Sequence, residues 1–412
     1  MIEFEPIEWV LIETANQLGF DKKTYKERLE VGDQVFSEVK EHGVETTFKK
    51  YNPDEPELFA RAVIALGDIA KGNPTNIIVG QDVASSGPQL YTVASRDSTG
   101  LSAVGAIDKI VNGIAVVPDL YKSIYEKLVP YGITGLSRKM VKEAVVPYAY
   151  GSTDSPRGTF GKWFPQFKKE YFNTIPAAAT FKDLLIDAWN SEAFEYVWVL
   201  PDGFTATTVP TKNVNLRLQL FNSHSYTYVT NEPCKLDKGD LHTKALSANV
   251  IHSLDAYCLR EMHRRCNYDK STLVIARNML RRKIRTQNPK AEHLESLYWK
   301  YKIFSMEIAE VIQKGIGNIS EEYIEVCLNY IEYLLSRKSF KLISIHDEFM
   351  TSPVNCNVLK QTYNTILGEL YCSDWLRQVT NTLRGDNEAD QYIEPINPNT
   401  LQQVLSSTYA IS

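Results

Sequence analysis

The sequence predicts an α+β fold, rich in helices and with only a few short strands. Apolar side chains recur about every 3.6 residues in two N-terminal stretches, as in amphipathic helices. Two short apolar runs end in carboxylates, at Asp82 and at Asp347, and have the length and composition of strands. Residues 214–230 alternate with a period of two around a polar break, which is typical of an antiparallel hairpin.

The composition is that of an ordinary globular protein. The chain has 412 residues, of which 43% are hydrophobic and 23% charged, enough for roughly two or three packed units. No apolar run approaches the roughly 18 residues of a membrane helix, and the acidic N-terminus lacks the order of a signal peptide. The six cysteines form no CxxC pair and fit reduced thiols in a cytosol. Because the net charge is −5, any nucleic-acid surface must be local.

These patterns, with the Gly and Pro breaks between them, place the expected elements along the chain. Helices are expected at residues 8–18, 56–66, 90–95, 120–128, 138–146, 248–266, over much of 264–337, and in a tail from 358. Strands are expected at residues 76–82, in the two arms of a hairpin within 212–232, and at 342–345. Turns are expected at residues 85–89 and 222–225. Pro147 is expected to kink or end its helix.

Asp82 and Asp347 are candidates for a metal site because each follows an apolar strand. An unpaired buried carboxylate is unfavourable or shifts its pKa, so a compensating cation is expected near His346-Asp347-Glu348. Magnesium prefers carboxylate oxygens. Two aspartates from separate strands can hold two ions, which activate a hydroxyl and stabilise a leaving pyrophosphate. Asp82 has a second interpretation as the N-cap of the following helix, and Asp-Glu pairs are common in surface turns.

The helix expected after residue 137 carries cations suited to a polyphosphate. Arg138 and Lys142 are four residues apart and therefore share one face. Tyr150 lies about two turns further along and points to the same side if the helix continues past Pro147. Arginine binds phosphate through paired hydrogen bonds, and lysine binds it as a point charge. The alternative is a solvated face on which the cations lie in water.

In their order along the chain, these residues resemble the motifs of the single-subunit RNA polymerases of bacteriophages and mitochondria. The matching motifs are Gln81-Asp82 with Ser86-Gly87-Pro88-Gln89, Arg138 to Lys142 with Tyr150-Gly151, Pro201-Asp202-Gly203-Phe204, His252-Ser253-Leu254-Asp255, and His346-Asp347-Glu348-Phe349. The resemblance implies a right-hand nucleotidyltransferase with fingers and with a palm built on an antiparallel sheet. Five motifs in order make the resemblance specific.

The resemblance also implies a role for each matching residue. The implied ligands of two Mg²⁺ ions are Asp82, Asp347 and the backbone carbonyl of Val83. The implied ligands of the rNTP triphosphate are Arg138, Lys142 and Lys22. Lys142 would also protonate the leaving pyrophosphate. Tyr150 and His252 would surround the ribose and sense its 2′-hydroxyl, because a deoxyribonucleotide would leave a buried tyrosine hydroxyl unpaired.

Two regions are candidates for DNA contact. The hairpin within 212–232 falls where the family carries its promoter specificity loop, and Asn215, Arg217 and Gln219 alternate onto one face, as base-reading side chains in a major groove would. Residues 260–290 contain ten Lys and Arg, including Arg281 and Arg282, against two acids. They fit DNA phosphates or a partner chain. The alternatives are an ordinary amphipathic hairpin and a solvated charged helix.

The match begins near residue 9, so the family's N-terminal promoter domain and thumb are expected to be absent. The resemblance therefore implies a heterodimer in which a second polypeptide supplies them, as for the larger catalytic chain of the two-subunit middle-gene RNA polymerases of some podoviruses. It implies a palm in two parts, residues 1–110 and 253–412, with fingers at 111–252. The interval between Asp255 and Asp347 is longer than the family usually has, which predicts a helical insertion at about 266–335.

The leading hypothesis is the catalytic subunit of a phage DNA-directed RNA polymerase. It would act in the cytoplasm of an infected bacterium on a DNA template, nascent RNA and rNTPs, with no membrane partner. One alternative is a DNA polymerase of the related replicative family, because Glu348 follows Asp347. Another is a non-catalytic DNA-binding subunit, whose expected mark is the loss of a metal-binding aspartate. Both aspartates are present.

Overall fold

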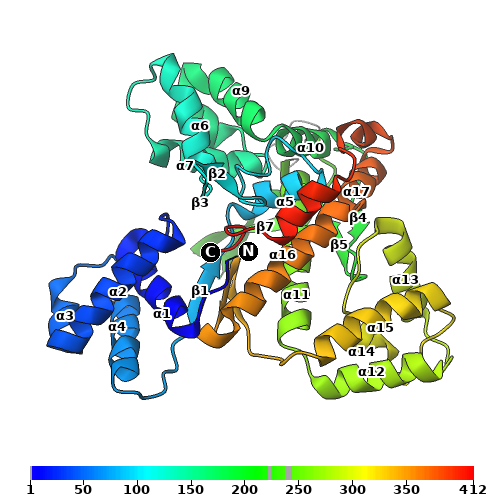
Figure 1. Ribbon diagram of the computed structural model, residues 1–412. Helices are drawn as coiled ribbons and strands as arrows, with labels where there is room; N and C mark the ends of the chain where they lie inside the picture. The colour runs from blue at the N-terminus through cyan, green and yellow to red at the C-terminus, as the bar shows by residue number, and fades with distance from the viewer. Residues whose placement is uncertain (1, 221–223, 238–243) are drawn as a thin grey trace.

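The computed structural model describes residues 2–220, 224–237 and 244–412 (Figure 1). Its fold is helix-rich α+β with small antiparallel sheets, which confirms the predicted fold class. Figure 1 shows a small central sheet with the N-terminal helices on one side, a second group of helices above it, and a third group at the lower right. The largest hydrophobic core runs through the parts that follow the first strand, and the N-terminal helices have a core of their own.

The central sheet brings together two segments that are far apart in the sequence. Strands β1 (Val79–Asp82), β9 (Glu348–Thr351) and β8 (Ile343–Ile345) pair antiparallel in the order β1-β9-β8. Asp82 pairs with Glu348, so the end of β1 lies beside the turn that connects β8 with β9. The two predicted carboxylate-ending strands therefore meet at one end of the same sheet.

Strand β8 differs from the prediction of a buried strand. The side chains of Ile343 and Ile345 are 48% and 56% exposed, whereas Leu342 just before the strand is buried. The reason is position, because β8 is an edge strand of three residues and pairs only with β9. The buried residues of the sheet lie instead on β1 and β9, where Val79 and Phe349 are buried.

The turn predicted at residues 85–89 is wrong, because helix α5 (Ser86–Ala94) already begins there. Ser85 has a left-handed backbone (φ +61°) and makes the sharp turn from β1 into this helix. Pro88 lies in the first turn of α5, where no intrahelical partner exists for its missing N–H. Because proline usually marks a break in a sequence pattern, the helix start was not evident.

Four helices form the N-terminal group, which confirms the helical prediction for this region. They are α1 (Pro6–Ala15), α2 (Tyr25–His42), α3 (Val44–Lys50) and α4 (Pro56–Ala70). A short π-helical segment, Asn16–Phe20, follows α1 and leads into the loop that carries Lys22.

The group above the sheet in Figure 1 contains the predicted cationic helix. It comprises α6 (Leu120–Leu128), α7 (Arg138–Ala149), α8 (Asp154–Phe160), α9 (Phe164–Thr174) and α10 (Pro176–Asp187). Pro147 lies inside α7 and does not end it, since the helix continues to Ala149. A short exposed sheet, β2 (Lys109–Val111) and β3 (Ile114–Val116), precedes this group.

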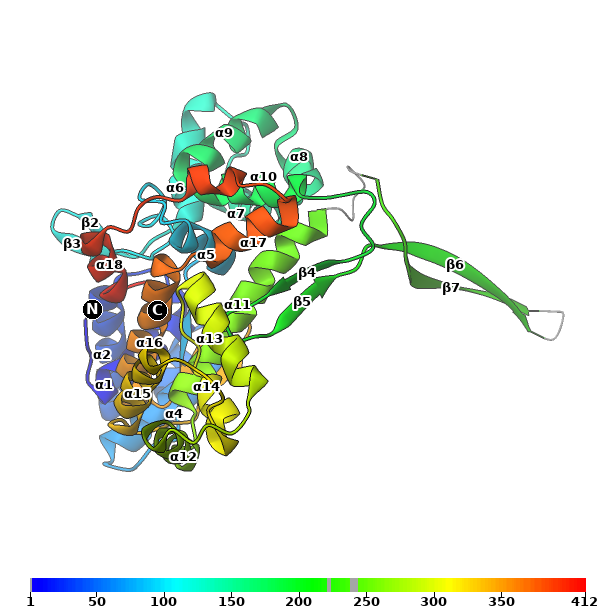
Figure 2. The same cartoon turned by 90° about the vertical axis from the view of Figure 1, so that its right-hand side faces the viewer.

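The predicted hairpin is confirmed, and it projects from the body of the molecule (Figure 2). Strand β6 (Thr211–Leu220) pairs with β7 (His224–Pro233) over their whole lengths. The turn predicted at 222–225 falls partly outside the described residues, and His224 and Ser225 belong to β7. A shorter pair, β4 (Tyr196–Val199) and β5 (Thr205–Thr208), lies at its base (Figure 2).

The remaining helices confirm the helical predictions for the C-terminal part of the chain. Helix α11 (Ala245–Cys266) packs against α5 and against α16 (Cys356–Cys372). The segment that was expected to be a helical insertion is helical, with α12 (Lys270–Arg282), α13 (Pro289–Tyr301), α14 (Ile308–Val311) and α15 (Glu321–Leu335). The tail contains α17 (Trp375–Arg384) and α18 (Pro398–Leu405), and its last residues return to β1, where Val83 bridges Ile411.

A buried lysine on α16 makes the stability of the protein depend on pH. Lys360 is fully buried, and its Nζ lies 2.9 Å from the Tyr25 hydroxyl. Burial lowers the pKa of Lys360 to about 7, and the charge of Arg28 acts in the same direction. Asp108 and Cys356 act in the opposite direction but do not offset the burial. The unfolded chain therefore holds a proton on this amine that the folded chain loses above about pH 7.

We expect Lys360→Met to stabilise the protein more at pH 6 than at pH 9. At pH 6 the folded wild type must bury a charged ammonium, whereas at pH 9 it buries the neutral amine. The increase in the free energy of unfolding caused by the substitution should be larger at pH 6 than at pH 9 by on the order of 2 kcal/mol, since one pKa unit corresponds to about 1.4 kcal/mol. Denaturant unfolding of both proteins at the two pH values measures it. A larger increase in stability at pH 9 than at pH 6 would show that burial does not lower the pKa of Lys360.

Candidate active site

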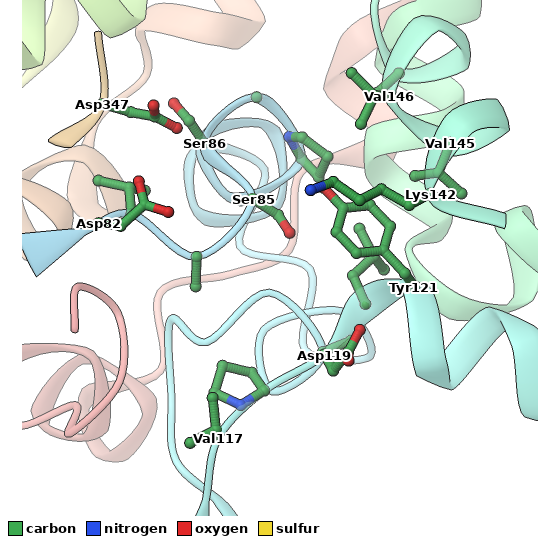
Figure 3. Close-up of a pocket in the computed structure, with 18 of the residues that line it drawn as sticks. Asp82, Ser85, Ser86, Val117, Asp119, Tyr121, Lys142, Val145, Val146 and Asp347 are labelled. Carbon is green, nitrogen blue, oxygen red and sulfur yellow. The ribbon is translucent and has the colours of Figure 1, made fainter. Parts of the chain in front are cut away.

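Asp82 and Asp347 lie side by side at one end of the central sheet (Figure 3). Asp82 is the last residue of β1, and Asp347 lies in the turn before β9. The Val83 N–H donates a hydrogen bond to the Asp347 backbone carbonyl (3.3 Å), which fixes the two segments to each other. His346 has a left-handed backbone (φ +55°), as does Ser85 beyond Asp82. Such sparsely populated conformations cluster at functional sites.

The two carboxylates repel each other, and nearby groups compensate this charge only in part. The Asp82 side chain is exposed to the pocket, but the surrounding walls remove much of its water. This loss of hydration, followed by the charge of Asp347, raises the pKa of Asp82 to about 6. Lys22 acts in the opposite direction, and Glu348 adds to the repulsion. A cation bound between the carboxylates would relieve it.

A pocket with a volume of about 320 Å³ joins these carboxylates to the predicted cations. The predicted site residues that line it are Lys22, Asp82, Val83, Arg138, Lys142, Tyr150 and Asp347. In Figure 3, Asp82 and Asp347 form one wall, and Lys142 extends from the opposite wall toward that side. The fold thus brings the predicted metal ligands and the predicted polyphosphate ligands into one cavity.

The two cations of α7 have different surroundings. The Arg138 Nε donates a hydrogen bond to Asp119 (2.6 Å). Lys142 forms no ion pair with any carboxylate in the described part of the chain, and its Nζ lies 5.9 Å from the centre of the Tyr121 ring. Lys142 is therefore available to a negatively charged ligand, whereas Arg138 is already oriented by an acid.

Tyr150 and His252 form a stacked pair. Their ring centroids are 4.5 Å apart and their planes differ by 10°. Burial raises the pKa of Tyr150 to about 12, and the charges of Asp255 and Asp347 contribute, so its hydroxyl is neutral near pH 7. A methyl group at Gly87 would lie 2.9 Å from the Tyr150 hydroxyl, which explains why glycine occupies that position. Tyr150 lines the pocket, and His252 supports it from α11.

Lys22 reaches the pocket from a loop held by a buried arginine. Arg28 donates hydrogen bonds to the backbone carbonyls of Asp21 (2.6 Å) and Lys23 (2.8 Å), on either side of Lys22. The ammonium of Lys22 pairs with Asp21 at 2.7 Å. The loop thus presents one further cation beside Asp82, whose pKa Lys22 lowers.

Several residues of the site were not assigned a role from the sequence. Asp119 and Tyr121, at the start of α6, contact the cations of α7. Asp255 accepts a hydrogen bond from the Ser86 hydroxyl (2.7 Å) and so joins α11 to α5. Asp255 belongs to the His252 to Asp255 motif. Asp119, directly before the helix expected at residues 120–128, has the residue type of an N-cap, but this pattern carries no information on a contact with Arg138.

Asn215, Arg217 and Gln219 lie on the projecting hairpin, outside the pocket (Figure 2). All three are exposed, and their partners on β7 are Val229, Thr227 and Ser225. They share one face, as the alternation predicted. The opposite face carries Leu216, Leu218, Tyr226 and Tyr228, which are exposed as well.

Most of the basic residues at 260–290 are paired with acids from other segments. The ion pairs are Arg260 and Arg264 with Asp202, Arg265 with Glu369, Arg277 and Arg281 with Glu332, Lys283 and Arg285 with Glu321, and Lys290 with Glu307. Arg281 and Arg282 are both exposed. Arg282 has no ion-pair partner among the described residues. The positive charge of this segment is therefore largely balanced by acids that lie close to it in the folded chain.

The donor set of the pocket fits magnesium. Two carboxylates from adjacent strand ends face one cavity, and their mutual repulsion is incompletely compensated. In the described residues no group of three or more His, Cys, Asp or Glu side chains is arranged around one metal position. Mg²⁺ is commonly held by one or two carboxylates, with waters and substrate phosphates completing its octahedron, so the two aspartates are enough donors for this ion.

The chain matches no protein-family model, and no curated protein is significantly similar to it. None of the helices within residues 2–220, 224–237 and 244–412 has the length and apolar character needed to cross a lipid bilayer. The functional assignment therefore depends on the geometry of the pocket and on the sequence motifs.

Proposed function

We propose that this chain is the catalytic subunit of a phage DNA-directed RNA polymerase of the single-subunit type. The observation that carries the proposal is that two strand-end aspartates and the cations Arg138 and Lys142 line one pocket. Nucleotidyl transfer requires carboxylates for metal ions and cations for a polyphosphate at the same place. In this proposal the central sheet with α11 and α16 is the palm, and α6 to α10 belong to the fingers.

Asp82 and Asp347, together with the Val83 carbonyl, would hold two Mg²⁺ ions, which activate the primer 3′-hydroxyl and stabilise charge on the leaving pyrophosphate. The residues of the chain then position the substrate. Arg138, Lys142 and Lys22 bind the triphosphate in line with the primer end. Lys142, which no carboxylate in the described chain neutralises, donates a proton to the departing pyrophosphate.

The stacked pair of Tyr150 and His252 supports an RNA rather than a DNA polymerase. A neutral, half-buried tyrosine hydroxyl in the pocket can hydrogen-bond the 2′-hydroxyl of a ribonucleotide. The alternative, a DNA polymerase of the related replicative family, is favoured by Glu348 after Asp347. Extension of an RNA primer on a DNA template with rNTPs, and then with dNTPs, separates the two. Preference for dNTPs would move the assignment to a DNA polymerase.

We expect Tyr150→Phe to reduce discrimination between rNTPs and dNTPs by about tenfold or more, with rNTP addition changed only a few-fold. The reason is that the variant keeps the ring that stacks on His252 and removes only the hydroxyl. The ratio of kcat/KM for ATP and dATP on one scaffold measures the effect. Tyr148→Phe is a matched control, since Tyr148 lies in the last turn of α7, two residues before Tyr150, but is buried outside the pocket. An unchanged ratio for Tyr150→Phe would remove the hydroxyl from the selection step.

The proposed partners are a DNA template, nascent RNA and a second polypeptide that forms a heterodimer with this chain in the cytoplasm of the infected host. Ile343 and Ile345 are exposed on the open edge of the central sheet and are the candidates for contact with this second chain. The exposed Asn215, Arg217 and Gln219 support DNA contact by the hairpin. Stimulation of primer extension by a lysate of the native host would support the existence of this second polypeptide.

A further inference from the structure

An acid lies at the triphosphate end of the pocket, where the proposed ligand is itself an anion. Asp119 directly precedes α6, and both of its carboxylate oxygens are engaged. Oδ1 accepts the Lys122 N–H (2.9 Å) and so caps the helix. Oδ2 accepts the Arg138 Nε–H (2.6 Å). The Asp119 side chain is only 18% exposed, so helix α6 fixes this carboxylate and, through it, the arginine.

The contact leaves the outer end of the Arg138 guanidinium free. Its Nε donates a hydrogen bond to Asp119, and neither terminal amino group forms a hydrogen bond with any residue of the described chain. Arg138 lines the pocket. A guanidinium held at Nε presents its two terminal amino groups in one plane. This arrangement can bind two phosphate oxygens at once.

Tyr121 strengthens this arrangement from the first turn of the same helix. Its ring centre lies 5.5 Å from the Arg138 guanidinium carbon and 5.9 Å from the Lys142 Nζ. Burial raises the pKa of Tyr121, and the side chain of Ser85, just beyond the Asp82 strand, acts in the opposite direction. The start of α6 thus connects the two cations of α7 to the loop that follows the carboxylate strand. Figure 3 shows Tyr121 beside Lys142, with Asp119 below Tyr121.

We propose that Asp119 is a positioning residue that aims the terminal amino groups of Arg138 at a bound triphosphate. The inference rests on the polyphosphate ligand of the proposed function, but it concerns one subsite and needs no primer or template. Asp119 does not touch the ligand and acts through Arg138. The simpler interpretation is that Asp119 only caps α6. The two differ because a serine can cap the helix but is too short to hold Arg138.

Calorimetric titration with inorganic triphosphate, without metal, tests this inference on the full chain. We expect Asp119→Asn and Asp119→Ser each to weaken binding by about tenfold, with thermal unfolding midpoints within about 2 °C of wild type because the cap is retained. We expect Arg138→Ala to weaken binding at least as much. In the double variant Asp119→Asn/Arg138→Ala, loss of Asp119 should cause no further weakening, because the carboxylate acts through the guanidinium.

Binding by Asp119→Asn that equals or exceeds that of wild type would overturn the inference, as would additive losses in the double variant. Absence of triphosphate binding by the folded wild type would overturn it as well. These outcomes are separate from primer extension. Binding that depends on Asp119 in a chain that extends no primer would retain the subsite and reject the polymerase. Primer extension by a chain whose triphosphate binding does not depend on Asp119 would retain the polymerase assignment and reject the role of Asp119.

Discussion

Asp347→Asn is expected to slow the addition of a ribonucleotide to a primer by on the order of a thousandfold or more. Asparagine keeps the size of the side chain and removes the charge that would hold a metal ion beside Asp82. Because Asp347 contributes to the raised pKa of Asp82, its loss also relieves repulsion in the free protein. The variant should therefore be folded, with a thermal midpoint equal to or above that of wild type.

The rate is measured as single-turnover addition of one rNMP to an RNA primer on a DNA template. Glu348→Gln provides the comparison, because Glu348 is the adjacent carboxylate and pairs with Asp82 across the sheet. Its expected loss is no more than about tenfold, since one neighbouring charge in a solvated site contributes little. A folded Asp347→Asn protein that keeps more than a tenth of the wild-type rate would contradict the metal role of this residue.

Lys142→Ala is expected to reduce the same rate by about a hundredfold to a thousandfold, through loss of a general acid and of a charge on the triphosphate. Lys142 is suited to both tasks because it is exposed to the pocket and has no acid partner among the described residues. Lys142→Arg should restore triphosphate binding better than it restores the rate, since arginine keeps the charge but releases a proton far less readily.

Lys139→Ala is the matched control for this helix. Lys139 is exposed on the same turn of α7 and does not line the pocket. We expect the nucleotide-addition rate of Lys139→Ala to stay within about twofold of wild type, as for most surface substitutions. Equal losses in Lys139→Ala and Lys142→Ala would indicate a general electrostatic effect of α7 instead of a specific role for Lys142.

The sequence predicted those parts of the site that short-range patterns determine. The strand ends at Asp82 and Asp347 were evident because each follows an apolar run, and Arg138 and Lys142 share a face at any position on a helix. The continuation of α7 past Pro147 was left open. It depends on packing around Tyr148, which is buried among Phe164, Phe167 and Tyr171.

Contacts between distant segments were not predictable. Arg281 pairs with Glu332, and Lys283 with Glu321, so a segment that is basic in sequence is largely neutralised by α15 and the residues before it. The exposure of Ile345 was missed for a similar reason, because the sequence does not indicate which strand lies at the edge of a sheet. The contact between Asp119 and Arg138 likewise requires the packing of α6 against α7.

The most direct test of the central claim is addition of a single nucleotide by the wild-type chain, alone and with a lysate of its native host. An RNA primer is annealed to four DNA templates that differ in the next template base, and all four rNTPs are supplied with Mg²⁺. We predict that the added ribonucleotide follows the template base and that EDTA abolishes the reaction. No addition by the folded chain under either condition, or addition that ignores the template, would contradict the assignment of Asp82 and Asp347 to a template-directed polymerase.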